Sequence, residues 1–175
     1  TAQVPQGITF GSTQTQQLVQ VAILQDIVDE DDQTFFVSLT GVTRLSVAGS
    51  DVQAVGTITD ENAEPTVSIG DVTVNENAGL ATFTIVLSHA SERSPQLTWS
   101  TSDGTAVAGN DYIAQALQVI TFGGTQTQQT IQAAILQDIV DEDDQTFLVN
   151  LASFTRLAVA GSDVQAVGTI GDDDS

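Results

Sequence analysis

Cysteine is absent from the 175-residue sequence, and this absence excludes several kinds of chemistry. There can be no disulfide scaffold, no thiol catalysis and no cysteine-ligated zinc or iron–sulfur centre, although the compartment stays open. No apolar run approaches the roughly 18–20 residues that a membrane helix needs. The first ten residues, TAQVPQGITF, lack the charged and apolar regions of a signal peptide. We therefore expect a soluble segment that does not insert into membranes and whose targeting signal lies outside it.

Basic residues are nearly as scarce. There is no lysine, and the sequence contains three arginines and 23 aspartates and glutamates, which gives a formal net charge of −20. A nucleic-acid binder needs a basic face, and so does a protein that is attracted to anionic lipid, so both classes are excluded. With 41% hydrophobic and only 15% charged residues, the chain has enough apolar material for a core, so we expect it to fold.

What the sequence does contain is a long internal repeat. At an offset of 112, residues 8–62 align with residues 120–174; 13 of the 55 positions differ and 42 are identical. This period is longer than the roughly 20–50 residues of a solenoid unit, so each unit should be a domain. The units are unequal, because residues 63–175 form a complete repeat and residues 1–62 match only its C-terminal half.

A half repeat would leave sheet edges and one core face uncovered. One interpretation is that the segment was cut from a longer array. The other is that strands from a second chain complete residues 1–62, in a swapped or interlocked assembly.

Short alternating segments rich in Val, Ile, Thr and aromatic residues indicate strands, and no segment has a long helical period. About seven or eight such segments in the complete repeat favour an all-β fold, an immunoglobulin-like, Greek-key antiparallel β-sandwich. Trp99, Phe122 and Phe147 are its expected core aromatics. The predicted strands are 66–69, 72–74, 80–87, 96–100, 117–122, 127–135, 146–151 and 164–170.

Fifteen of the 23 carboxylates lie in four short loops, residues 26–32, 60–61, 138–144 and 172–174. Two carboxylates about 4 Å apart repel by roughly 1 kcal/mol in water and about 4 kcal/mol at the dielectric of a protein surface. A divalent cation would reverse that sign. Oxygen ligands in flexible loops, with no cysteine and a single histidine, select Ca²⁺.

Solubility and salt adaptation account less well for the acidic loops than a bound cation does. A solvated acidic surface would not require the same loop in both units, and halophilic adaptation would scatter acids over all surfaces. An EF-hand fails, because Asp143 stands where that loop needs glycine and no flanking helices are indicated.

The complete repeat resembles a Calx-beta domain in the segments PTVSIGDVTVNENAGLATFTIVLS, WSTSDGTAVAGNDY, LQVITF, ILQDIVDEDDQTFLVNL and VGTIGDDD. The first unit resembles the C-terminal half of the same domain. The resemblance implies a Greek-key sandwich with a calcium cluster at one pole. Such domains occur as calcium sensors in sodium/calcium exchangers, in an integrin beta chain and in arrays on bacterial surface proteins.

The resemblance also implies a ligand set. In the complete repeat it comprises Glu76, Asp103, Asp138, the carbonyl of Val140, Glu142, Asp172, Asp173 and Asp174. Neutral Gln137 and Gln145 stand where fuller clusters carry acids, so fewer ions or weaker binding are expected. In the first unit the matching positions are Asp26, Val28, Glu30, Asp60, Glu61 and Asn62, but counterparts of Glu76 and Asp103 are missing. That site should bind calcium poorly, or only when another chain supplies the first half.

Several neighbouring residues are expected to be structural. Gly104 and Gly109 fit turns with positive φ, and Asp111 and Tyr112 should fix their loop by hydrogen bonds. Arg44 and its counterpart Arg156 could pair with nearby carboxylates, at about 0–1 kcal/mol for an exposed pair.

An enzyme is the weakest class, because the single histidine, His89, lies in a polar turn and no aromatic cleft is evident. The first hypothesis is a structural, adhesion-type segment of an extracellular or cell-surface repeat protein, in which Ca²⁺ stiffens loop poles and joints between neighbouring repeats. The alternative is a calcium-sensing regulatory module of a membrane transporter of the sodium/calcium exchanger type.

Overall fold

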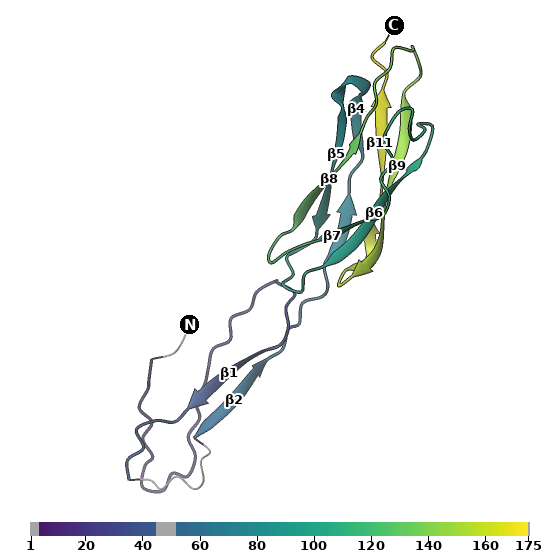
Figure 1. Cartoon of the computed structure of the whole chain (residues 1–175). Helices are drawn as coiled ribbons and strands as arrows, with labels where there is room; N and C mark the ends of the chain where they lie inside the picture. Colours follow the sequence, from purple (N-terminus) through teal and green to yellow (C-terminus); the bar gives the residue numbers. More distant parts are fainter. Residues whose placement is uncertain (1–3, 45–51, 175) are drawn as a thin grey trace.

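The computed structural model describes residues 4–44 and 52–174. The molecule is elongated: a β-sandwich that ends at the C-terminus lies beyond an extended N-terminal part, as Figure 1 shows. Among the described residues there is no helix long and apolar enough to cross a membrane.

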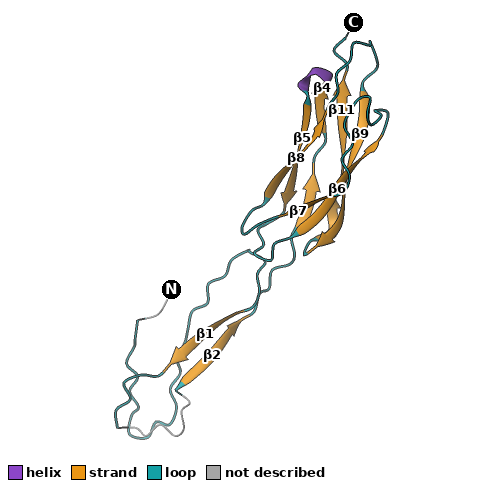
Figure 2. Ribbon diagram, in the orientation of Figure 1, coloured by secondary structure: helices purple, strands orange, loops and turns teal. Residues whose placement is uncertain are grey.

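The sandwich consists of a four-stranded and a five-stranded sheet (Figure 2). The first sheet has the order β10-β3-β5-β8, and the second has the order β4-β11-β9-β6-β7. A single-turn 3₁₀ helix, η1 (Glu76–Ala78), follows β4. The strands are β3 (Thr66–Ile69), β4 (Val72–Asn75), β5 (Leu80–Leu87), β6 (Gln96–Asp103), β7 (Gln118–Thr121), β8 (Gln128–Ala134), β9 (Gln145–Thr155), β10 (Ala158–Asp163) and β11 (Gln165–Gly171).

The predicted all-β sandwich is confirmed, with one addition to its topology. Two pairs are parallel, β10 with β3 and β11 with β4, and the remaining pairs are antiparallel. Only Gly70 and Asp71 separate β3 from β4, so the chain runs along one sheet and then crosses to the other in the same direction. Strand β10 was not predicted, because its Ala-Gly-Ser-Asp composition is typical of a loop.

The core lies between the two sheets and consists of alternate side chains of their strands. Trp99, Phe122 and Phe147 are buried, as predicted. Phe147 is central, because Phe83 meets its ring edge-on at 6.0 Å between centroids and Tyr112 stacks on it at 4.6 Å.

In the described part of the first unit, residues 4–44 and 52–62, one strand pair of the sandwich is present, β1 (Gln33–Ser38) with β2 (Gln53–Ile58). These strands match β9 and β11. Residues 16–22, which match β8, form no strand, because β8 pairs with β5 and the first unit has no counterpart of β5. Val19 is accordingly 49% exposed, whereas Ile131, its counterpart, is 5% exposed. The sequence expectation that the half repeat leaves a core face uncovered is confirmed.

Gly168 lies opposite Phe147 in the β11–β9 pair, and an added Cβ would stand 2.5 Å from the Phe147 ring. We expect Gly168→Ala to lower the free energy of unfolding by about 1–3 kcal/mol, because the Phe147 ring is fully buried against Tyr112 and Phe83 and has little room to move aside. Urea unfolding measures the change. The matched control is Gly56→Ala, which meets the half-buried Phe35 in the same way and should change stability by about 0.5 kcal/mol or less. Equal losses in both variants would contradict this reasoning.

Candidate metal centre

Three chain segments meet at the C-terminal end of the sandwich because of the strand directions. Strand β4 runs parallel to β11 with Asn75 opposite Gly171, so η1 and the residues after β11 emerge at the same end. Strand β9 is antiparallel to β11, so the loop of residues 136–144 that precedes β9 lies there too. We call residues 76, 138–144 and 172–174 the second pole.

Within the second pole, Glu76, Asp138 and Asp174 each offer a carboxylate oxygen, and these oxygens lie within 4.8 Å of one another. This arrangement can hold a metal ion. Glu76 is only 7% exposed, and its Oε2 has no hydrogen-bond partner among the described residues. Oδ2 of Asp174 is also buried and unpartnered in that part of the chain. Buried carboxylate oxygens without a partner are costly unless a cation or a proton satisfies them.

Burial and mutual repulsion raise the pKa values of three acids at the second pole. Burial raises the pKa of Glu76 above its ordinary value, and Asp138 and Asp172 raise it further. Burial and neighbouring aspartates likewise raise the pKa of Glu142 and of Asp174.

Hydrogen bonds within the loops set the positions of the other predicted ligands. Asp138 accepts from the Val140 N–H at 2.7 Å, and Asp172 accepts from the Asp174 N–H at 3.4 Å. Asp173 turns to η1, where it accepts from the Asn77 amide at 2.6 Å. Gln145 donates a hydrogen bond to the carboxylate of Glu142. The amide at position 145, where fuller clusters were expected to carry an acid, therefore orients Glu142.

Asp103 is not a member of the three-carboxylate cluster. Its Oδ1 accepts from the Tyr112 hydroxyl at 2.7 Å and from the Ala108 N–H at 3.0 Å. Burial, followed by this hydrogen bond, raises the pKa of Tyr112 to about 12. Through this oxygen, Asp103 therefore stabilises the loop that contains Ala108 and Tyr112. Its role as a calcium ligand remains a prediction.

The neighbouring loop confirms two predictions and corrects one. Asp111 accepts from the Val107 N–H at 2.6 Å, and Tyr112 fixes the loop to the core, as expected. Gly109 has the predicted positive φ of 91°. Gly104 does not; it is glycine because a Cβ there would stand 2.4 Å from the carbonyl oxygen of Thr146.

The first unit forms a corresponding first pole from residues 26–32 and 60–62. Its internal hydrogen bonds repeat those of the second pole: Val28 N–H to Asp26 at 2.9 Å, and Asp60 N–H to Asp32 at 3.0 Å. A recess there is lined by five of the six matching residues, Asp26, Glu30, Asp60, Glu61 and Asn62.

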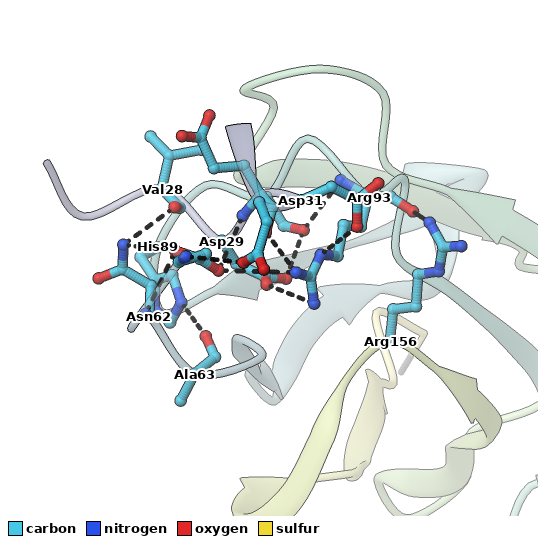
Figure 3. Close-up of polar contacts among 12 residues, drawn as sticks. Val28, Asp29, Asp31, Asn62, Ala63, His89, Arg93 and Arg156 are labelled. Carbon is cyan, nitrogen blue, oxygen red and sulfur yellow. Dashed lines mark hydrogen bonds and ion pairs between the residues drawn. The ribbon is translucent and has the colours of Figure 1, made fainter. Parts of the chain in front are cut away.

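The first pole has a counter-charge of its own, which sequence reasoning missed. Arg93, in the turn between β5 and β6, inserts its guanidinium among three acids of the first unit (Figure 3). It lies 3.3 Å from Asp29, 3.1 Å from Asp31 and 3.7 Å from Asp60, and it also donates to the carbonyl of Glu30. Asp29 is fully buried by this contact. All three acids belong to the first unit and Arg93 to the second, so no local sequence pattern links them.

Asp60 of the first pole has a lowered pKa, in contrast to the raised pKa values of Glu76, Glu142 and Asp174 at the second pole. Burial alone would raise the pKa of Asp60, but N–H donors from Asn62 and Glu30, together with Arg93, hold it below its ordinary value. All three ion pairs among the described residues belong to Arg93. Arg156 does not pair with a carboxylate there; its guanidinium donates to the carbonyl of Arg93 at 2.5 Å. Arg44 shares its positive φ but forms none of the described ion pairs.

Backbone hydrogen bonds also connect the first pole to the turn between β5 and β6, and we call this contact between the two units the joint. Asp29 and Ser91 form a parallel β-bridge, in which Asp29 donates to Ala90 and accepts from Glu92. The Ser91 hydroxyl donates to Asp29 at 2.7 Å. His89 donates to the carbonyl of Ala63 at 2.8 Å, a contact within the joint.

Comparison with known proteins agrees with the repeat and the fold. The family model of the Calx-beta domain matches residues 2–62 and again residues 60–174. The chain belongs to the Calx-beta domain family. Among curated relatives, adhesion G-protein coupled receptor V1 of Danio rerio is 28% identical over 96% of this chain, and sodium/calcium exchanger 2 of Homo sapiens is 26% identical over 82%. The chain spans only 3% and 18% of these proteins.

Solved structures show the same architecture for this Calx-beta chain. The calcium binding domain CBD12 of CALX1.1 is 27% identical with a TM-score of 0.55, and the match covers 62% of this chain and 46% of that one. The apo-form Calx CBD1 domain, at 24% identity and a TM-score of 0.52, covers 62% of this chain and 99% of its own. This second likeness supports the fold alone.

The raised pKa values predict how stability depends on pH without metal. A carboxyl group whose pKa is raised in the folded state stabilises the fold when protonated, and this contribution is lost as pH rises through the raised pKa. For Glu76 the loss should fall above its ordinary pKa of 4.5. In chelator, Glu76→Gln should therefore raise the melting temperature at neutral pH and flatten its decline with pH. The control is Glu64→Gln, an exposed acid near the opposite end of the sandwich. A lower melting temperature for Glu76→Gln in chelator would contradict the predicted repulsion.

Proposed function

We propose that this chain is a calcium-binding segment of a larger extracellular or cell-surface repeat protein of the adhesion type, in which Ca²⁺ stiffens loop poles and the joints between repeats. The observation that carries the proposal is the cluster of Glu76, Asp138 and Asp174 at the end of the complete repeat. A role without catalysis fits a Calx-beta domain, a calcium-binding regulatory or structural module.

The donor set fits calcium. All donors at the second pole are oxygens, and the single histidine lies in the joint. Hard cations with flexible coordination suit carboxylates on loops, and Ca²⁺ accepts six to eight oxygen ligands at variable geometry. Glu76, Asp138 and Asp174 would hold the ion, and we propose Asp103, Val140, Glu142, Asp172 and Asp173 as further ligands. The ion would supply positive charge at a pole that none of the described ion pairs reaches.

The first unit is proposed as a weaker site. Asp26, Val28, Glu30, Asp60 and Glu61 correspond to ligands of the second pole, but Asp60 already faces Arg93. No residue of the first unit corresponds to Glu76.

The structural array is favoured by the near identity of the two units, which differ at 13 of 55 aligned positions. The likeness to the adhesion receptor also spans both units, at 96% of this chain. The alternative, a calcium-sensing module of a transporter, is favoured by the exchanger relatives and by the likeness to a calcium-binding tandem.

Calcium should raise the melting temperature of the chain relative to chelator, because the ion binds the folded state. Asp138→Asn should remove most of that rise, since it takes one of the three clustered carboxylates. Its matched control is Asp26→Asn, the same substitution in the first unit, which should leave most of the rise. Differential scanning calorimetry in calcium and in chelator measures all three. An unchanged melting curve in calcium would refute the proposal.

The affinity separates the two candidate functions. A dissociation constant of about 10⁻⁴–10⁻³ M is typical of extracellular modules, whereas sensors bind at about 10⁻⁷–10⁻⁵ M. We expect titration calorimetry to give the weaker range, because Gln137 and Gln145 contribute no charge. A micromolar or tighter constant would favour the transporter module.

A further inference from the structure

The joint shows which residues of one repeat of this chain contact the next repeat. We call residues 88–94, between β5 and β6, the joint turn. The turn presents a backbone edge, the Ser91 hydroxyl and the Arg93 guanidinium, and all three engage the first pole at Asp29. Asp31 and Asp60 supply the remaining charge. Hydrogen bonds, a fully buried carboxylate and three ion pairs make this a specific contact, not a chance approach of two loops.

The second pole carries the same residues. In the alignment of the two units at an offset of 112, Asp29, Asp31 and Asp60 correspond to Asp141, Asp143 and Asp172. The local scaffold also recurs: Asp172 donates its N–H to Asp144 at 3.3 Å, as Asp60 does to Asp32 at 3.0 Å. The backbone that presents Asp29 to the joint turn therefore has a counterpart at Asp141.

The two poles differ in what covers them. Asp29 is fully buried by the joint turn, whereas Asp141 is exposed. No described ion pair reaches the second pole, and both Arg93 and Arg156 lie at the opposite end of the sandwich, where Arg156 contacts the Arg93 carbonyl. The second pole thus presents the acidic half of the contact without the basic half.

We propose that the second pole, through Asp141, Asp143 and Asp172, is a docking surface for the joint turn of a further repeat, one that carries serine and arginine two residues apart as Ser91 and Arg93 are. The joint turn of this chain is already engaged by its own first pole, so the occupant is the turn of another repeat, not that of a second copy of the chain. This inference rests on the proposed role as a segment of an array, but not on calcium. Asp141 and Asp143 are outside the proposed ligand set, and of the three acids only Asp172 belongs to both.

A tethered test suits this contact. Exposed ion pairs individually stabilise a contact very little, and a short tether raises the effective concentration of the partner to about the millimolar range. The chain is therefore lengthened after Asp174 by a second copy of residues 63–175, which reproduces the spacing of Asn62 and Ala63 at the existing joint. Because the protein has no cysteine, Thr84→Cys in each copy provides two unique sites for spin labels on exposed positions of β5.

Double electron–electron resonance between the labels measures how well the new joint is fixed. We expect one narrow distance distribution in calcium and in chelator. Arg93→Ala in the appended copy, or Asp141→Asn in the original, should remove the narrow component. The matched control is Arg93→Ala in the original copy, which alters only the existing joint and should leave the distribution narrow. Asp141→Arg with Arg93→Asp in the appended copy should restore it.

Two results would overturn the inference: a broad distribution in the unsubstituted protein, or a narrow one that survives Arg93→Ala in the appended copy. Far-ultraviolet circular dichroism confirms that each variant is folded. A broad distribution together with a normal calcium-dependent rise in melting temperature would reject the docking surface and leave calcium binding intact. A narrow distribution without that rise would do the reverse.

Discussion

Repulsion among carboxylates crowded at the strand ends is the constraint on which the rest of this structure depends. The sandwich topology brings separate acidic loops to one pole, because β4, β9 and β11 all begin or end there. Such a pole requires positive charge. Within residues 4–44 and 52–174, the chain provides it where Arg93 enters the first pole and buries Asp29. At the second pole the described residues provide none, and buried oxygens of Glu76 and Asp174 remain unpartnered. The net charge of −20 is thus a local property that ligands can offset.

A second constraint is the availability of strand partners. Nearly the same sequence occurs in both units, yet residues 128–134 form β8 and residues 16–22 form no strand. Phe10 is 43% exposed, whereas its counterpart Phe122 is fully buried. Alternation and β propensity are therefore not sufficient for a strand, and the pairing and burial supplied by β5 to β7 decide the outcome.

The sequence predicted most of the fold and named the three carboxylates that the fold brings together. Strands with strict alternation, such as β5, were placed correctly because period-two patterning against a core is a strong signal. Glu76, Asp138 and Asp174 were named through the family resemblance, and the topology brings them together. Gly104 was misinterpreted, because a close backbone approach across strands has no local signature. Arg93 was missed because its partners lie in the other repeat. The bond from Tyr112 to Asp103 depends on three-dimensional placement in the same way.

Anomalous scattering from a crystal of the chain grown with calcium, or with a lanthanide in its place, tests the central claim most directly. We predict a peak between Glu76, Asp138 and Asp174. We also predict that Arg93 stays among Asp29, Asp31 and Asp60, with no peak between those three acids. A second pole without a peak, or a peak in the first pole with Arg93 displaced, would contradict the claim.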